Sequence, residues 1–182
     1  VVQAINIFQN EEIKKINKIF NKKIKCLRSS YKFIETQKKI NLITNKKKNI
    51  LIAPTWSTNF YKKNLHNKLF KILKDKNIDF VFRPHPMSIK KKEIDLKKIK
   101  DLKINFDDDK EIQFEKYSNL ITDWSGIYFE FAILKKKFPI LINSKQKIRN
   151  HSPNFYSSWE PIEIKTREKI CYLVPVDQLE KV

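Results

Sequence analysis

Short apolar runs that alternate with amphipathic segments restrict the fold of this chain more than any other feature. From residue 49 onward, five such runs have the length and composition of buried strands: residues 50–53, 78–82, 102–106, 119–122 and 138–142. The segments between them have apolar residues at helical spacing or a helix-capping pattern and predict helices at 60–76, 88–100, 109–117 and from 125. Strands that alternate with helices in this order favour right-handed crossovers. The sequence therefore predicts an α/β fold with a parallel sheet.

The two ends of the chain do not show this alternating pattern of apolar runs and amphipathic segments. Apolar residues at helical spacing predict a helix at 11–25 and a second helix or turn at 31–43, followed by an exposed linker at 45–49. Residues 1–48 carry no recognisable chemistry, and we expect them to be a helical connecting or inter-domain segment. Beyond residue 143 the pattern is irregular and predicts a short strand at 161–164, with helices at 166–173 and 176–181.

Composition narrows the class of protein. With 182 residues and 41% hydrophobic content, the chain can bury the core of one domain. It has no apolar run of about twenty residues and no basic, apolar leader. Cys26 and Cys171 lie far apart without metal-ligand spacing, so we expect reduced thiols and a cytoplasmic location. Because the sequence begins at Val1, we expect it to be a fragment of a longer protein.

The formal charge of +19 indicates an acidic partner. A nucleic acid is the first candidate, but nearly all basic residues are lysines spread along the chain, and arginine occurs at four positions only. Arginine is the residue favoured for planar phosphate and base recognition. We therefore expect a nucleotide, a polyanionic product or an anionic membrane surface as partner, and no specific nucleic acid.

Polar residues follow several of the predicted strands. In an open parallel sheet, ligands bind outside the carboxyl ends of the strands. The residues that fall there are Pro54, Thr55 and Trp56, then Arg83 and His85, then Asp107, Asp108 and Asp109, and finally Thr122, Asp123, Ser125 and Gly126. Their shared edge predicts one ligand site.

The turn that ends the strand at 119–122 holds Gly126, the only glycine of the chain. A glycine there suggests close approach of the backbone to a neighbouring element or to a ligand. The helix that follows would direct free amides at the turn and form an anion site. The simpler alternative is that Asp123 or Ser125 caps this helix.

Two prolines bracket the histidine in residues 82–86. Each proline holds the preceding residue extended, so Arg83 and His85 have little backbone freedom. Arg83 could bind a phosphate or neutralise a buried acid, and His85 could donate a proton to a leaving phosphate oxygen. The alternative is a rigid loop whose polar groups bond to neighbouring carbonyls.

The sequence gives less support to other candidate functional residues. His66 lies on a lysine-rich helical segment and is expected to be solvated, and His151 lies on a loop. Trp56 and Trp124 adjoin the two turns and are expected to pack there. Adjacent Asp107, Asp108 and Asp109 do not have the geometry of a metal site, and no metal or cofactor is expected. The chain lacks a Walker loop, a dinucleotide-binding glycine fingerprint, zinc-ligand spacing and a nucleophile elbow.

Three segments in this order resemble the CDP-glycerol glycerophosphotransferase family of teichoic-acid and surface-polymer synthesis: residues 51–56, 83–86 and 121–132. The resemblance covers about residues 49–145. Many members have Tyr and a second Ser where this chain has Trp124 and Gly126, which changes the shape of the phosphate cradle.

The resemblance implies two facing Rossmann-like domains, as in B-type glycosyltransferases, with residues 49–182 forming the C-terminal, donor-nucleotide half. It implies that glycerol phosphate moves from CDP-glycerol to a hydroxyl of a surface polymer, with release of CMP. The implied catalytic residues are His85 and Asp123. The implied substrate-binding residues are Pro54, Thr55, Trp56, Arg83, His85, Thr122, Ser125 and Gly126. An N-terminal acceptor domain outside this chain, and peripheral contact with the inner face of the cell membrane, are further implied partners.

Two alternatives remain open from the residues. One is a related glycosyltransferase that uses another nucleotide sugar. The other is a non-catalytic basic module that binds nucleic acid or an acidic polymer, and the net positive charge supports this alternative.

Overall fold

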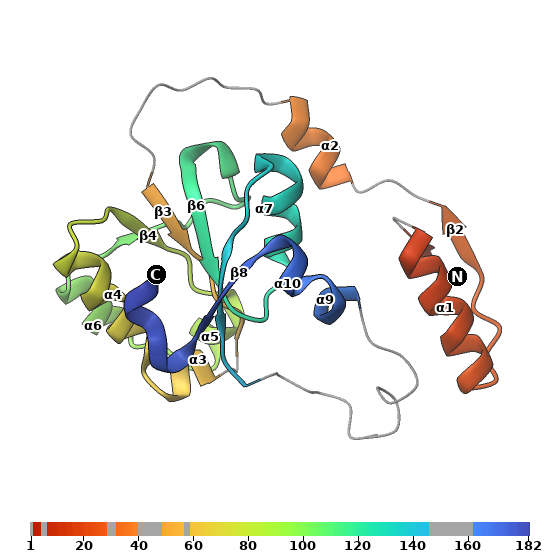
Figure 1. The fold of residues 1–182 in the computed structure, drawn as a ribbon, viewed down its shortest axis with the longest axis horizontal. Coiled ribbons are helices and arrows are strands. Elements are labelled where there is room, and N and C mark those ends of the chain that lie inside the picture. The colour runs from red at the N-terminus through yellow and green to blue at the C-terminus, as the bar shows by residue number, and fades with distance from the viewer. Residues whose placement is uncertain (1, 5–6, 29–31, 40–48, 57–58, 146–161) are drawn as a thin grey trace. The chain divides into compact units, whose positions relative to one another are not determined.

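The computed structural model describes residues 2–4, 7–28, 32–39, 49–56, 59–145 and 162–182 (Figure 1). The chain divides into two compact units. Residues 42–152 and 166–182 form one, here called the sheet unit, and residues 1–41 and 153–165 form the other, the small unit. None of the helices in the described ranges combines the length and the apolar character needed to cross a bilayer.

The sheet unit contains six parallel strands in the order β5-β4-β3-β6-β7-β8. The strands are β3 (Asn49–Ile52), β4 (Phe80–Phe82), β5 (Asn105–Phe106), β6 (Tyr117–Thr122), β7 (Ile140–Asn143) and β8 (Tyr172–Pro175). The helices are α3 (Asn59–Lys62), α4 (Leu65–Asp75), α5 (Pro86–Lys90), α6 (Leu96–Asp101), η1 (Phe114–Lys116), α7 (Ile127–Lys135), α10 (Arg167–Ile170) and η2 (Val176–Lys181). The predicted α/β, Rossmann-like fold is confirmed.

The order in which the chain adds strands to the sheet changes from one side of β3 to the other between β5 and β6. The chain runs outward from β3 through β4 to β5, then returns to place β6 on the other side of β3. Ile52 pairs with Phe82 on one side and with Ile121 on the other, so the carboxyl ends of these strands are level. The loops that follow β3, β4 and β6 therefore meet at the switch point, where open α/β sheets bind ligands.

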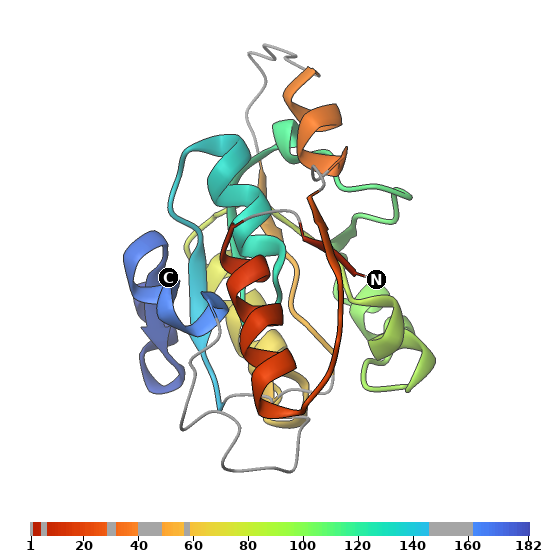
Figure 2. The same ribbon diagram turned by 90° about the vertical axis from the view of Figure 1, so that its right-hand side faces the viewer.

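The sheet is buried on both faces. Ile52, Phe82 and Ile121 belong to a core that includes apolar residues of α3, α4 and η2. Their neighbours Leu51 and Leu120 are also fully buried and, because side chains alternate along a strand, point to the opposite face. In Figure 1, α4 and η2 lie to the left of the strands and α7 to the right, and Figure 2 views the unit from the α7 side.

The small unit contains a two-stranded parallel pair, β1 (Val2–Ala4) and β2 (Cys26–Arg28), with helices α1 (Ile7–Ile19), α2 (Lys32–Lys39) and α9 (Ile162–Lys165). The side chain of Asn17 fixes the turn after α1 through two bonds of 2.9 Å, because it donates to the carbonyl of Ile24 and accepts from its amide. The helix predicted at 11–25 thus begins at Ile7 and ends at Ile19, and the strand pair was not predicted.

Three predicted elements were wrong, and two helices are divided. Residues 172–175 form β8 instead of the end of a helix, and 162–165 form α9 instead of a strand. In place of a helix at 109–117 there is only η1, because the carboxylate of Asp107 accepts the Asp109 amide and forms a turn. Left-handed residues at Asn64 (φ 55°) and Lys92 (φ 53°) interrupt the segments predicted as single helices at 60–76 and 88–100.

His66 is buried, contrary to the prediction that it is solvated. It lies in α4, is 8% exposed and is surrounded by aromatic rings, with ring centroids 5.5 Å from Tyr61, 6.0 Å from Phe70 and 6.4 Å from Phe60. Burial lowers the pKa of His66 below its ordinary value of 6.5. The neutral imidazole is therefore part of the core.

This burial predicts a pH-dependent stability. The unfolded chain takes up a proton on His66 more readily than the folded chain. The free energy of unfolding is therefore unaffected by His66 above pH 6.5 and declines as the pH falls below it. The slope is at most about 1.4 kcal/mol per pH unit. We expect urea denaturation from pH 7.5 to 5 to show a smaller decline for His66→Phe than for the wild type. Equal declines would contradict the assignment.

Candidate functional site

A pocket of about 260 Å³ lies at the switch point of the sheet. It is called here the switch-point pocket, and it is lined by Ala53, Pro54, Arg83, Pro84, His85, Pro86, Ile112, Ser125, Ile127 and Glu130. Most of these residues follow β3, β4 or β6 or lie in the first turn of α7, and Ile112 lies between β5 and η1. The structure therefore brings together four of the predicted site residues, Pro54, Arg83, His85 and Ser125.

Thr122 and Asp123 are fully buried, and neither lines the switch-point pocket. The hydroxyl of Thr122 donates to the carbonyl of Ala53 at 2.6 Å. The carboxylate of Asp123 accepts the backbone amide of Thr55 at 2.8 Å. Both side chains thus join the loop after β6 to the loop after β3 and fix two walls of the pocket relative to each other.

His85 is held in a defined tautomer by the backbone. It is the N-cap of α5, and its Nδ1 accepts the amide of Met87 at 3.1 Å. When Nδ1 of a neutral imidazole accepts, Nε2 carries the proton. Pro84 and Pro86 restrict the backbone on both sides, so the side chain that lines the pocket is positioned as a hydrogen-bond donor.

Arg83 neutralises a buried acid, one of the two roles predicted for it. Its Nη1 lies 3.0 Å from Oδ1 of Asp107, whose side chain is almost fully buried. The hydroxyl of Tyr117 donates to the other carboxylate oxygen of Asp107 at 2.8 Å, and burial together with this carboxylate raises the pKa of Tyr117. The Arg83 side chain remains 20% exposed and lines the pocket while the ion pair fixes its position.

The start of α7 is open. Gly126 is its N-cap with φ −63° and ψ −12°, and no side-chain cap hydrogen bond is formed there, so the structure does not support the alternative in which Asp123 or Ser125 caps this helix. A Cβ built at Gly126 would have no heavy atom of the described chain within 4 Å. Neither backbone conformation nor protein packing requires glycine here. Ser125 lines the pocket beside the first amides of α7, which point along the helix axis toward it.

Trp56 lies next to this site without lining it. Its ring centroid is 6.3 Å from that of His85, and Nζ of Lys91 is 4.3 Å from the Trp56 ring centroid. The contact with the lysine is a cation–π interaction. Trp56 therefore lies against the two ends of α5, where His85 is the N-cap and Lys91 the C-cap.

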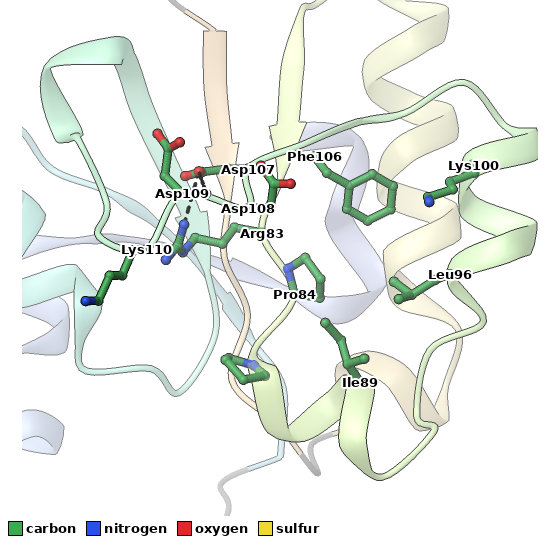
Figure 3. Close-up of a pocket in the computed structure, with 11 residues that line it drawn as sticks. Arg83, Pro84, Ile89, Leu96, Lys100, Phe106, Asp107, Asp108, Asp109 and Lys110 are labelled. Carbon is green, nitrogen blue, oxygen red and sulfur yellow. Dashed lines mark hydrogen bonds and ion pairs between the residues drawn. The ribbon is translucent and has the colours of Figure 1, made fainter.

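A larger neighbouring pocket of about 490 Å³ shares Arg83, Pro84 and Pro86 with the first (Figure 3). It is called here the β5 pocket. Its other lining residues are Ile89, Leu96, Lys100, Phe106, Asp107, Asp108, Asp109 and Lys110. Figure 3 shows Phe106, Leu96 and Ile89 on one side and the Arg83–Asp107 pair on the other. An apolar wall thus faces a charged one.

Within the described ranges, no group of three or more His, Cys, Asp and Glu side chains could hold a metal ion. Two of the three adjacent aspartates have other roles: Asp107 binds Arg83 and Tyr117, and Asp109 forms an ion pair with Lys116 at 2.7 Å. His151 lies outside the described residues, as do Phe155, Tyr156 and Trp159, for which the sequence predicts a docking patch.

The sequence did not single out three residues that the structure places at or beside the site. Ile112 and Glu130 line the switch-point pocket, and Arg167 contacts the turn at Asp123 and Trp124. Glu130 could have been found, because it falls four residues, about one helical turn, after Gly126. Nothing in the sequence connects Arg167 with a turn more than 40 residues earlier.

The fold and the pocket define a Rossmann-like domain with hydrogen-bond donors at its switch point. The family model described as CDP-Glycerol:Poly(glycerophosphate) glycerophosphotransferase matches residues 25–160, and the chain belongs to this family. It is accordingly of the glycerophosphotransferase type. The match begins before residue 49, where the motifs start. Neither the search of curated proteins nor the search of solved structures found a match.

Thr122 and Asp123, whose side chains join the two loops, are called here the braces. Their difference from the residues that line the pocket can be tested through the free energy of unfolding. Thr122→Val removes a buried hydrogen bond and leaves the Ala53 carbonyl without it, so the free energy of unfolding should fall by about 1–3 kcal/mol. Ser125→Ala, at a half-buried position on the pocket wall, should change it by no more than about 0.5 kcal/mol. Urea denaturation measures both. Equal losses would contradict the assignment of Thr122 as a brace.

Proposed function

We propose that the sheet unit binds CDP-glycerol and supports transfer of its glycerol phosphate to a hydroxyl of a cell-surface polymer. The acceptor oxygen forms a bond to the phosphorus that carries glycerol, and the bond from that phosphorus to the CMP oxygen breaks. CMP leaves with the electron pair, and the acceptor proton passes to a base. The observation that carries this proposal is the meeting of His85, Ser125 and the open start of α7 in one pocket of a chain of this family.

The diphosphate of the donor would occupy the switch-point pocket. The donors available there are Nε2 of His85, the hydroxyl of Ser125 and the first amides of α7, and charge-assisted bonds to phosphate are stronger than neutral ones. The open space beside Gly126 leaves room for a phosphate oxygen to approach the backbone. Charge that develops on the leaving CMP would be stabilised by the same fixed donors.

The other residues at this edge of the sheet would position the walls of the pocket or contact the ligand. Thr122 and Asp123 would hold the loop after β3 in place, because their side chains are buried and bonded to the Ala53 carbonyl and the Thr55 amide. Pro54, Thr55 and Trp56 belong to this loop. Arg83 would supply positive charge at the wall while paired with Asp107. Glu130 would accept hydrogen bonds from glycerol or ribose hydroxyls, which a carboxylate on the pocket wall can do.

The nucleoside would extend into the β5 pocket. The two pockets share Arg83, Pro84 and Pro86, so one ligand can reach both. A planar base fits between the apolar wall of Ile89, Leu96 and Phe106 and the polar loop at 107–110. The acceptor and its base would come from a domain outside this chain, and the net charge of +19 would favour an anionic membrane surface close to the polymer.

Calorimetric titration with CDP-glycerol tests the diphosphate site. His85→Asn keeps a side chain that can cap α5 but removes the donor at Nε2, and Ser125→Ala removes the hydroxyl. Each should weaken binding roughly tenfold, the effect of losing one hydrogen bond to a charged group. Lys90→Ala, an exposed change on α5, is the control and should bind as the wild type does. Absence of wild-type binding, or equal affinities for all four proteins, would contradict the proposal.

A matched pair of exposed apolar residues tests the β5 pocket. Ile89 lines it and is 41% exposed, and Leu102 is 42% exposed and is not among its lining residues. Ile89→Ala should weaken binding of CDP about threefold while leaving that of pyrophosphate unchanged, since part of the apolar contact is lost. Leu102→Ala should change neither. An equal effect of Ile89→Ala on both ligands would place the base elsewhere.

Competition among CDP-, UDP- and GDP-linked donors separates this proposal from a glycosyltransferase that uses another nucleotide sugar. We expect CDP to displace a bound donor more effectively than UDP or GDP. Stronger displacement by UDP or GDP would favour a glycosyltransferase that uses another nucleotide sugar.

A further inference from the structure

Arg167 is a buried arginine at the first position of α10, and it contacts the turn between β6 and α7. It is 3% exposed. Its Nη1 donates to the carbonyl of Asp123 at 3.1 Å, and its guanidinium carbon lies 3.6 Å from the centroid of the Trp124 ring. One planar group thus binds the backbone of one turn residue and stacks on the side chain of the next.

The other contacts of this turn leave a clear role for Arg167. The carboxylate of Asp123 is bonded to the Thr55 amide, and the indole of Trp124 donates to the carbonyl of Ser144 at 2.8 Å. Arg167 adds the bond to the Asp123 carbonyl, two residues before Ser125. It therefore acts on the part of the turn that sets the direction of the Ser125 backbone.

Burial of this charge is costly. Removal from water lowers the pKa of Arg167, and the nearby Tyr128, Cys171 and Asp123 oppose this effect. Its Nη2 is buried and has no hydrogen-bond partner among the described residues. Stacking on an indole and a bond to a carbonyl offset part of the desolvation cost, and a lysine could not make both contacts with the same geometry.

We propose that Arg167 is a positioning residue for the switch-point pocket. By holding Asp123 and Trp124 it fixes the turn so that Ser125 and the first amides of α7 face the diphosphate. It lines neither described pocket, so it acts through the turn and not by touching the ligand. This inference rests on the proposed function and extends it to the C-terminal segment, which lies beyond the residues matched by the family model.

A double-mutant cycle on the whole chain separates positioning from general destabilisation. Arg167→Met should weaken CDP binding roughly tenfold, and Arg167→Lys should restore little of it. Ser125→Ala should cost much less affinity in the Arg167→Met background than in the wild type, because the serine is already displaced. His85→Asn should cost the same in both, since His85 is held by α5. Lys169→Met, an exposed change on α10, should leave binding unchanged.

A spectroscopic measurement tests the same inference without a ligand. In a chain whose sole tryptophan is Trp124 (Trp56→Phe and Trp159→Phe), Arg167→Met should shift the emission maximum and increase quenching by iodide, whereas Lys169→Met should do neither. Unchanged emission, or equal coupling of Arg167 to Ser125 and to His85, would overturn the inference. If the wild type binds no CDP, the proposed function fails with the role in binding, and the emission still decides whether Arg167 holds the turn.

Discussion

Two hydrogen bonds across the switch point, one buried and one partly buried, hold the site together. The Thr55 amide donates to the carboxylate of Asp123, and the hydroxyl of Thr122 donates to the carbonyl of Ala53. In a parallel sheet the loops after β3 and β6 would otherwise be free to separate, because the ladder of backbone bonds ends with the strands. These bonds extend the order of the sheet into its loops. The pocket therefore has walls that are set by the fold before any ligand binds.

The residues at this edge fall into two groups with different burial. Thr122, Asp123 and Arg167 are buried and bind protein, whereas His85 and Ser125 are half-buried and line the pocket. This division gives a rigid framework with hydrogen-bond donors that face the pocket. A donor whose tautomer and backbone are already fixed loses little free energy on reorganisation when it meets a phosphate, which is the condition under which electrostatic stabilisation is most effective. The proposed transferase chemistry relies on this preorganisation.

The sequence predicted the parallel sheet well, because its strands are buried and read as apolar runs. It also predicted which loops share an edge, since that follows from topology alone. Tertiary contacts account for the failures. β8 contains Pro175 and pairs with β7 only, as an edge strand. The Asp107 carboxylate, held by Arg83 and Tyr117, accepts the Asp109 amide and forms a turn in place of a helix. His66 is enclosed by rings from α3 and α4. Local patterns contain none of these contacts. Arg167 could not be found for the same reason.

The most direct test of the account is a crystal structure of the chain with CDP bound. We predict that the β-phosphate lies in the switch-point pocket, within hydrogen-bond distance of Nε2 of His85 and of the amides that begin α7. The braces from Thr122 and Asp123 should be unchanged from those described here. A diphosphate bound on the lysine-rich surface, with the switch-point pocket empty, would contradict the central claim.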